Sequence, residues 1–178
     1  GVDYEFWDWR DLKEEEYRLH SKLISVIARL TDGRVGARQL EDQKIDNLVE
    51  VLFESLGIRK IVFVHDNVDR YVDTRSFLPT GGMDKLVETA LTRGHNSKFV
   101  FTCRPFIKHA AVGFYQINLG GLLLQDTINL FNAYRIPMKE EDKQNLVNEA
   151  HELTMGHPFW LNLIAAQALR GKESVRRF

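Results

Sequence analysis

The chain has 178 residues, with 24 Lys and Arg against 25 Asp and Glu and a formal net charge of −1. This balance excludes a strong overall attraction to nucleic acid or to anionic lipid, so we expect neither nucleic acid nor a membrane as partner. One cysteine excludes an internal disulfide, and no apolar run reaches the roughly 18 residues of a membrane-spanning helix. No signal sequence opens the chain, and we expect a cytoplasmic protein.

The first part of the chain begins with a strand pattern and two helix patterns. Residues 4–10 alternate large aromatic and polar residues, which predicts a strand whose aromatic side chains lie in the core. Asp11 is a candidate cap for an amphipathic helix that continues to Leu30. The glycines of 31–36 predict a loop, and the apolar spacing predicts a second helix over 39–57.

Two further strands are expected where β-branched and aromatic residues run without interruption. These runs are 61–64 and 98–102, and they are typical of strands in a parallel sheet that is covered on both faces. A polar loop over 66–76 and a helix over 83–92 lie between them, and 116–119 is a candidate short strand. We therefore predict an α/β fold with a mostly parallel sheet over residues 1–121.

The pattern after residue 121 is helical only. Helices are expected over 123–134, 139–154 and 158–170, and they predict a small all-helical subdomain over 122–178 that ends in a basic tail.

Carboxylates follow the first of the two buried strands. Asp66 comes directly after the apolar run, and Asp69 follows three residues later. Ligands of open parallel sheets bind at the carboxyl ends of the strands, where a carboxylate can hold a water of Mg²⁺ and a second one can orient an attacking water. The alternative is an acidic turn in which both residues cap backbone N–H groups, and this stretch alone does not separate the two.

The second buried strand ends in a hydroxyl and a guanidinium. Thr102 and Arg104 occupy these positions, and a guanidinium binds phosphate as a bidentate fork. Taken alone, a surface arginine after a strand is the simpler interpretation. On adjacent parallel strands, however, Asp66, Asp69, Thr102 and Arg104 would share one edge of the sheet.

The helical part contains a Gly-His-Pro turn. Gly156 ends one predicted helix and Pro158 starts the next, a position that proline favours. Capping alone explains both residues; the functional alternative is a tight turn that presents apolar surface and backbone groups to a flat ligand.

The order of these motifs resembles the core and lid of a signal-transduction (STAND-class) P-loop ATPase, within the AAA+-like group that includes NB-ARC-like nucleotide-binding domains. The resemblance spans nearly the whole chain. It implies that Asp66 belongs to a Walker B strand end as the Mg²⁺-associated acid and that Asp69 is the catalytic acid. It further implies that Thr102 and Arg104 form sensor 1 at the γ-phosphate. Gly156 and Pro158 resemble the lid motif near adenine, and ATP or ADP with Mg²⁺ would be bound.

The chain departs from this family in one respect. It contains no Gly-x-x-x-x-Gly-Lys-Ser/Thr phosphate loop, because the glycine-containing stretch 33–38 lacks the Lys-Ser/Thr pair and follows a helix. We interpret 33–38 as a surface loop. We expect the chain to begin just after a P-loop, so that an upstream P-loop segment and further domains of the same protein are its partners. Hydrolysis of ATP by this chain alone is then not expected.

The missing strand has a predicted structural consequence. In this family the P-loop strand lies beside the sensor 1 strand, so its absence would leave an unpaired strand edge and an exposed apolar face. Pairing with another chain, including a homo-oligomer, is one expected response; closure of the gap and poor stability are others.

We predict an ATP- or ADP-binding molecular switch in which nucleotide lies between core and lid. The first alternative is a non-catalytic interaction or oligomerisation module that binds no nucleotide. The second is a DNA-associated AAA+-like ATPase, which the net charge disfavours and the basic residues of 170–177 leave open.

Three lesser candidates complete the set. Cys103 with His65 as base is a weak candidate for a nucleophile, and a lone cysteine is more often a small buried residue. Trp7, Trp9 and Tyr4 are candidates for base stacking, although aromatic residues of such strands are usually core. The six histidines show no spacing typical of metal ligands.

Overall fold

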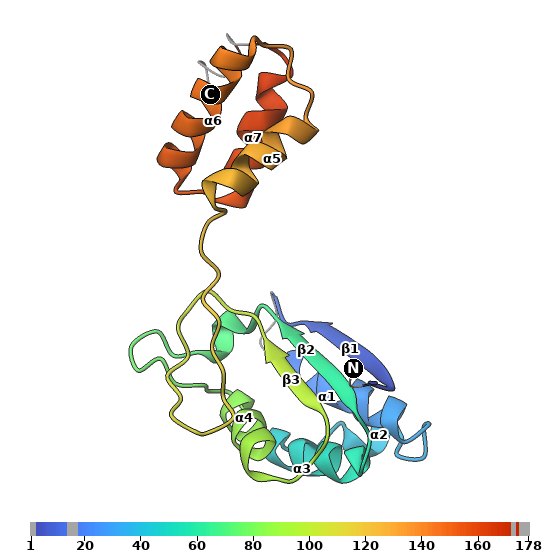
Figure 1. The fold of residues 1–178 in the computed structure, drawn as a ribbon. Coiled ribbons are helices and arrows are strands. Elements are labelled where there is room, and N and C mark those ends of the chain that lie inside the picture. Colours follow the sequence, from blue (N-terminus) through green and yellow to red (C-terminus); the bar gives the residue numbers. More distant parts are fainter. Residues whose placement is uncertain (1–2, 14–17, 172–173, 175–178) are drawn as a thin grey trace. The chain divides into compact units, whose positions relative to one another are not determined.

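The computed structural model describes residues 3–13, 18–171 and 174. The chain divides into two compact units, Gly1–Gln116 and Ile117–Phe178, and each is described by itself. The described residues form three strands, seven α-helices and one 3₁₀-helix (Figure 1). In chain order they are β1 (Phe6–Asp11), α1 (Arg18–Leu30), α2 (Ala37–Leu40), α3 (Ile45–Leu56), β2 (Ile61–Asp66), η1 (Val68–Tyr71), α4 (Met83–Thr92), β3 (Lys98–Phe101), α5 (Leu124–Ala133), α6 (Glu140–Thr154) and α7 (Pro158–Ala168).

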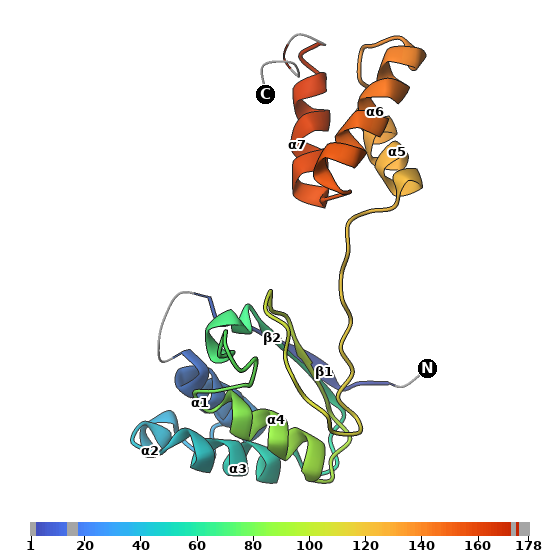
Figure 2. The same ribbon diagram turned by 90° about the vertical axis from the view of Figure 1, so that its left-hand side faces the viewer.

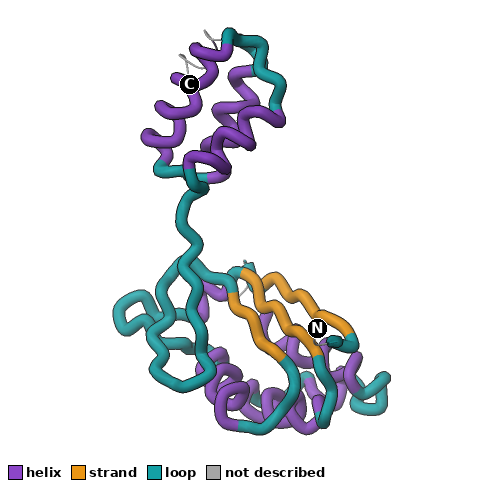
Figure 3. Tube along the Cα trace, in the orientation of Figure 1, coloured by secondary structure: helices purple, strands orange, loops and turns teal. Residues whose placement is uncertain are grey.

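The first unit is an α/β domain built on a three-stranded parallel sheet in the order β1-β2-β3 (Figure 3). Trp7 and Trp9 pair in register with Val62 and Val64, and Val64 pairs in turn with Val100. β1 and β3 are the edges of this sheet. The prediction of a parallel α/β domain is confirmed.

All long helices of this unit lie on one face of the sheet. Figure 2 shows α1, α3 and α4 on the same side of β1 and β2. Crossovers between parallel strands are almost always right-handed, so a sheet that grows steadily in the order β1-β2-β3 receives every crossover helix on the same face. The core lies between that face and the helices, where the Phe63 and Phe99 rings stack with centroids 4.9 Å apart.

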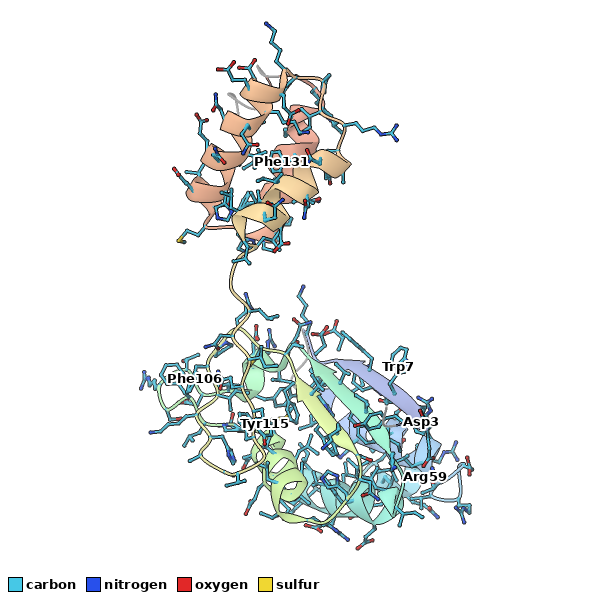
Figure 4. All side chains as sticks on the ribbon, viewed as in Figure 1. Asp3, Trp7, Arg59, Phe106, Tyr115 and Phe131 are labelled. Carbon is cyan, nitrogen blue, oxygen red and sulfur yellow. The ribbon has the colours of Figure 1, made fainter. Side chains whose placement is uncertain are left out.

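The opposite face of the sheet carries exposed aromatic residues. Trp7 is 67% exposed and Trp9 53%, and Figure 4 shows the Trp7 side chain pointing away from β1. The prediction that these tryptophans lie in the core is wrong, because the helices cover the other face of β1. Val100 is also exposed, whereas Val62 and Val64 on the same face are half-buried.

The predicted helix over 39–57 is two helices. Residues 41–44 form a turn between α2 and α3, and Lys44 has an extended backbone (φ −66°, ψ 152°). The polar side chains of 41–44 have nothing to bury, so only Leu40 and the apolar residues of α3 attach this region to the core. The loop predicted over 31–36 is confirmed. The predicted helix cap at Asp11 is wrong, because Asp11 is the last residue of β1 and the next described residues, Leu12 and Lys13, have no regular secondary structure. Residues 14–17 lie outside the described residues.

Residues 116–119 do not form the predicted strand. They have no regular secondary structure and all four are exposed, and the described residues of the second unit contain no strand with which 117–119 could pair.

The second unit is a three-helix bundle. α5, α6 and α7 pack around Phe131, Leu161 and Ala165, all of which are fully buried (Figure 4). Their bounds differ from the predicted helices by one or two residues, which confirms three helices in this part of the chain.

Candidate functional site at the carboxyl edge of the sheet

Asp66 lies at the carboxyl end of β2, where the chain makes a sharp turn. The next residue, Asn67, has a left-handed backbone (φ 60°, ψ 48°) that Asn tolerates better than most residues. This turn leads directly into η1, whose first turn contains Asp69. Val68 is fully buried and its N–H donates to the carbonyl of Thr102 (2.9 Å), so the end of β2 is fastened to the segment that follows β3.

Thr102 joins the ends of β2 and β3. Its N–H donates to the His65 carbonyl (3.0 Å), and its hydroxyl accepts a hydrogen bond from the Asn67 N–H (3.0 Å). The same hydroxyl donates to a carboxylate oxygen of Asp66. The predicted neighbours Asp66 and Thr102 are therefore in direct contact, with Thr102 exposed and Asp66 half-buried.

Asp69 and Arg104 form a second pair beside the first. Asp69 accepts two hydrogen bonds from Arg104, one from the backbone N–H (2.8 Å) and one from Nε of the guanidinium (2.6 Å). Burial acts to raise the pKa of Asp69, but these two hydrogen bonds and the Arg104 charge outweigh it and hold the pKa below its ordinary value. Asp69 is ionised at neutral pH and faces a side chain that is 92% exposed.

The end of β1 adds residues that sequence reasoning missed. Oδ1 of Asp11 accepts hydrogen bonds from the Asn67 side-chain amide (3.0 Å) and from the Lys13 N–H (2.8 Å). The Leu12 N–H donates to the Asp66 carbonyl (2.8 Å). The strand register places Asp11 directly beside Asp66. The alternation of β1 places Asp11 on the same face of the strand as Trp7 and Trp9. A pairing of β1 with β2 would then have predicted Asp11 beside Asp66, at the carboxyl edge of the sheet.

Six residues therefore form what we term the edge cluster: Asp11, Asp66, Asn67, Asp69, Thr102 and Arg104. Mg²⁺ needs only one or two protein carboxylates when water and phosphate supply its other ligands, and the half-buried Asp66 carboxylate could serve as one of them. An exposed guanidinium binds phosphate oxygens. Among the described residues, no group of three or more His, Cys, Asp or Glu side chains is arranged to hold a metal ion.

Gly156 and Pro158 are explained by packing within the second unit. Gly156 has φ 73°, and its carbonyl accepts a hydrogen bond from the Leu122 N–H (2.8 Å). A Cβ at Gly156 would lie 2.3 Å from the Leu122 carbonyl oxygen, so this close backbone approach requires glycine. Pro158 is the first residue of α7. The contact of both residues with a nucleotide stays a prediction, because the two units are described separately.

Cys103 does not have the environment of an activated thiol. Its Sγ donates to the Pro105 carbonyl (3.1 Å), and burial together with the negative charge of Asp69 raises the pKa of the thiol. Arg104, the next residue in the chain, does not offset these effects, because its guanidinium is paired with Asp69.

Comparison with protein-family models, with curated proteins and with solved structures gives no match for this chain. No helix in the described part of the chain combines the length and the apolar character needed to cross a membrane.

Proposed function

We propose that this chain is part of a STAND-class P-loop ATPase and acts as an ATP- or ADP-binding switch at the edge cluster. The observation that carries the proposal is the contact of Asp66 with Thr102 next to the pair of Asp69 and Arg104, at the carboxyl ends of two adjacent parallel strands. This edge is where ligands of open parallel sheets bind.

Each residue has a distinct role in the proposed switch. Asp66 holds a water of Mg²⁺, and the Thr102 hydroxyl fixes the orientation of its carboxylate. Asp69 orients the water that attacks the γ-phosphate. Mg²⁺, when bound with the nucleotide, neutralises phosphate charge that develops during transfer.

Arg104 is the residue through which the switch would sense the γ-phosphate. Its exposed ion pair with Asp69 contributes little stability, because water screens it. A γ-phosphate carries more charge and more acceptor oxygens than Asp69, so it competes for the guanidinium. Movement of Arg104 to the phosphate frees Asp69 to accept a proton or orient water, and loss of the γ-phosphate returns Arg104 to Asp69.

The phosphate loop itself has to come from outside these 178 residues. β3 is an edge strand, with β2 on one side only, and the exposed Val100 lies on it. An upstream P-loop strand that pairs with this edge would place its glycine-rich loop beside Asp66 and Thr102.

Calorimetric titration with ADP and ATP, each with and without Mg²⁺, tests the proposal on this chain and on a form extended at its N-terminus. We expect the extended form to bind nucleotide. Asp66→Ala should abolish the Mg²⁺ dependence without unfolding, whereas Glu41→Gln, in the exposed turn before α3, should leave it unchanged. Arg104→Ala should remove the preference for ATP over ADP, with Arg38→Ala as its matched control. An extended form without a Gly-Lys-Ser/Thr loop, or without nucleotide binding, contradicts the proposal.

The exposed face of the sheet favours a second candidate, a non-catalytic interaction module. A groove of about 910 Å³ lies along β1, and residues from both faces of the strand line it, Trp7 and Trp9 from the exposed face and Arg29 from the helix side. Large exposed aromatic residues beside a free strand edge are typical of protein–protein interfaces. Under this candidate the same titrations give no nucleotide binding, and association of the chain depends on the tryptophans.

A further inference from the structure

A chain of hydrogen bonds connects the ends of all three strands. It begins at Asp11 on β1, passes through the side chain and backbone N–H of Asn67, continues through the Thr102 hydroxyl, and ends on the Asp66 carboxylate. None of the functional roles above uses Asp11 or Asn67. Their place in this chain of contacts is therefore unexplained by the proposed chemistry alone.

Asn67 makes two hydrogen bonds that point in opposite directions. Its backbone N–H donates to Thr102 toward β3, and its side-chain amide donates to Asp11 toward β1, each at 3.0 Å. The left-handed backbone makes this possible, and Asn, Asp and Gly are the residues that adopt it most readily. Gly has no side-chain amide to donate to Asp11, and Asp would place a second carboxylate against Asp11. Only Asn among the three supplies both contacts.

Asp11 and Asp66 are carboxylates on neighbouring strands at the same register. Like charges at such positions repel each other, so each carboxylate needs its own donor to stay in place. Thr102 supplies the donor for Asp66, and Asn67 and the Lys13 N–H supply donors for Asp11. Asn67 therefore acts on both: it anchors Asp11 directly, and it orients the hydroxyl that holds Asp66.

We infer that Asp11 and Asn67 are positioning residues that set the orientation of the Asp66 carboxylate for Mg²⁺. This inference rests on the proposed function. Asp11 and Asn67 act only through Thr102 and the turn after β2. Their loss changes the Mg²⁺-dependent part of nucleotide binding and leaves the Mg²⁺-independent part in place.

A double-mutant cycle that exchanges the two residues tests this inference. Asn67→Asp places two carboxylates together, and we expect the Mg²⁺-dependent gain in ADP affinity to fall roughly tenfold, the loss typical of a hydrogen bond to a charged group. Asp11→Asn should have a smaller effect, because an amide oxygen still accepts from Asn67 and Lys13. The exchange variant D11N/N67D restores an amide facing a carboxylate, and the gain should recover to near the wild-type value.

Calorimetry in the form of the protein that binds MgADP provides the first readout. Recovery in the exchange variant supports the inference, because the contact between amide and carboxylate, and not the identity of either residue, then determines the Mg²⁺ dependence. Equal Mg²⁺ dependence in all four proteins overturns it. If the exchange variant does not fold, Asn67→Gly keeps the left-handed turn without the amide, and an unchanged Mg²⁺ dependence in that variant also overturns the inference.

Hydrogen exchange provides a second readout that does not need nucleotide. In the 178-residue chain, hydrogen exchange at the amides of residue 67 and Val68 should accelerate in Asn67→Asp and slow again in D11N/N67D. Wild-type protein that binds no MgADP contradicts the proposed function, and in that case the exchange rates still decide whether Asp11 and Asn67 hold the turn. Unchanged rates across the cycle show that they do not.

Discussion

The two faces of β1 carry the reverse of what an alternating strand ordinarily shows. The face toward the helices carries Asp8 and Arg10 beside the half-buried Phe6, and the face away from them carries Trp7 and Trp9. The Asp8 side chain is only 2% exposed and accepts hydrogen bonds from Arg10 and from Arg29 on α1. A buried carboxylate with two guanidinium partners is tolerated because its charge and its hydrogen bonds are matched.

This difference shows that chain topology, and not the polarity of a strand, determines which face of a sheet is covered first. The strand order β1-β2-β3 with right-handed crossovers sends every helix of the first unit to one face. β1 contributes two polar residues and the half-buried Phe6 to that face, and β2 contributes Phe63, which is fully buried. The face that carries Trp7 and Trp9 is not covered by these helices.

The largest expected effect of this asymmetry is the difference in stability lost when Phe63 or its neighbour Val64 is replaced by alanine. Phe63→Ala removes a buried ring that stacks on Phe99, and we expect a loss of about 3–5 kcal/mol in the free energy of unfolding. Val64→Ala on the opposite face is the matched control, with an expected loss of about 1 kcal/mol because Val64 is only half-buried. Urea unfolding followed by circular dichroism measures both. Equal losses would mean that the two faces are covered alike.

The covered face also predicts acid sensitivity centred on His65. This side chain stacks against the rings of Phe99 and Phe101 and is 3% exposed, and its Nδ1 has no hydrogen-bond partner among the described residues. Burial lowers its pKa from 6.5 to about 4, with the charge of Asp8 opposing this shift and that of Arg10 adding to it.

Because the folded-state pKa of His65 lies below the unfolded one, the unfolded chain binds more protons between these two values. The contribution of neutral His65 is therefore complete above pH 6.5 and is lost as the pH falls toward 4, by an amount of about 3 kcal/mol. Urea midpoints across this pH range measure the loss, and His65→Phe should flatten the profile. Asp69, whose folded pKa is lowered from 3.8, stabilises the folded state above that pH, and its contribution is lost only as the pH falls below it. A wild-type profile that is already flat would contradict the burial of a neutral imidazole.

Much of the fold could be predicted from the sequence because the signals are local. The runs at 61–64 and 98–102, the helix at 83–92 and the three C-terminal helices depend on periodicity within a few residues. The face that β1 presents to the core could not be predicted, because the alternation is symmetric and the deciding factor is where α1 and α3 pack. The ion pairs of Asp8 with Arg10 and Arg29 depend on that packing and cannot be recognised from the alternation of polar and apolar residues in β1.

The edge cluster shows the same division between local and distant information. Asp66, Thr102, Asp69 and Arg104 could be grouped because two parallel strands end at one edge, and the hydrogen bonds between them agree with that grouping. Asp11 and Asn67 could not, because their contact joins residues 56 positions apart and depends on a left-handed turn.

The smallest effect on stability, and the largest on association, is expected at the tryptophans. Replacing Trp7 and Trp9 by Thr keeps strand propensity and removes side chains that are more than half exposed, so the free energy of unfolding should change by less than about 1 kcal/mol. Sedimentation velocity of the wild-type chain should show association that increases with concentration, and the double variant should show less of it. Phe77→Ser, which removes an exposed aromatic residue from the irregular segment between η1 and α4, is the control and should leave association unchanged. If the tryptophans are instead fully protected from acrylamide quenching in a dilute wild-type chain, the two faces of β1 are both covered, and the contrast between them does not hold.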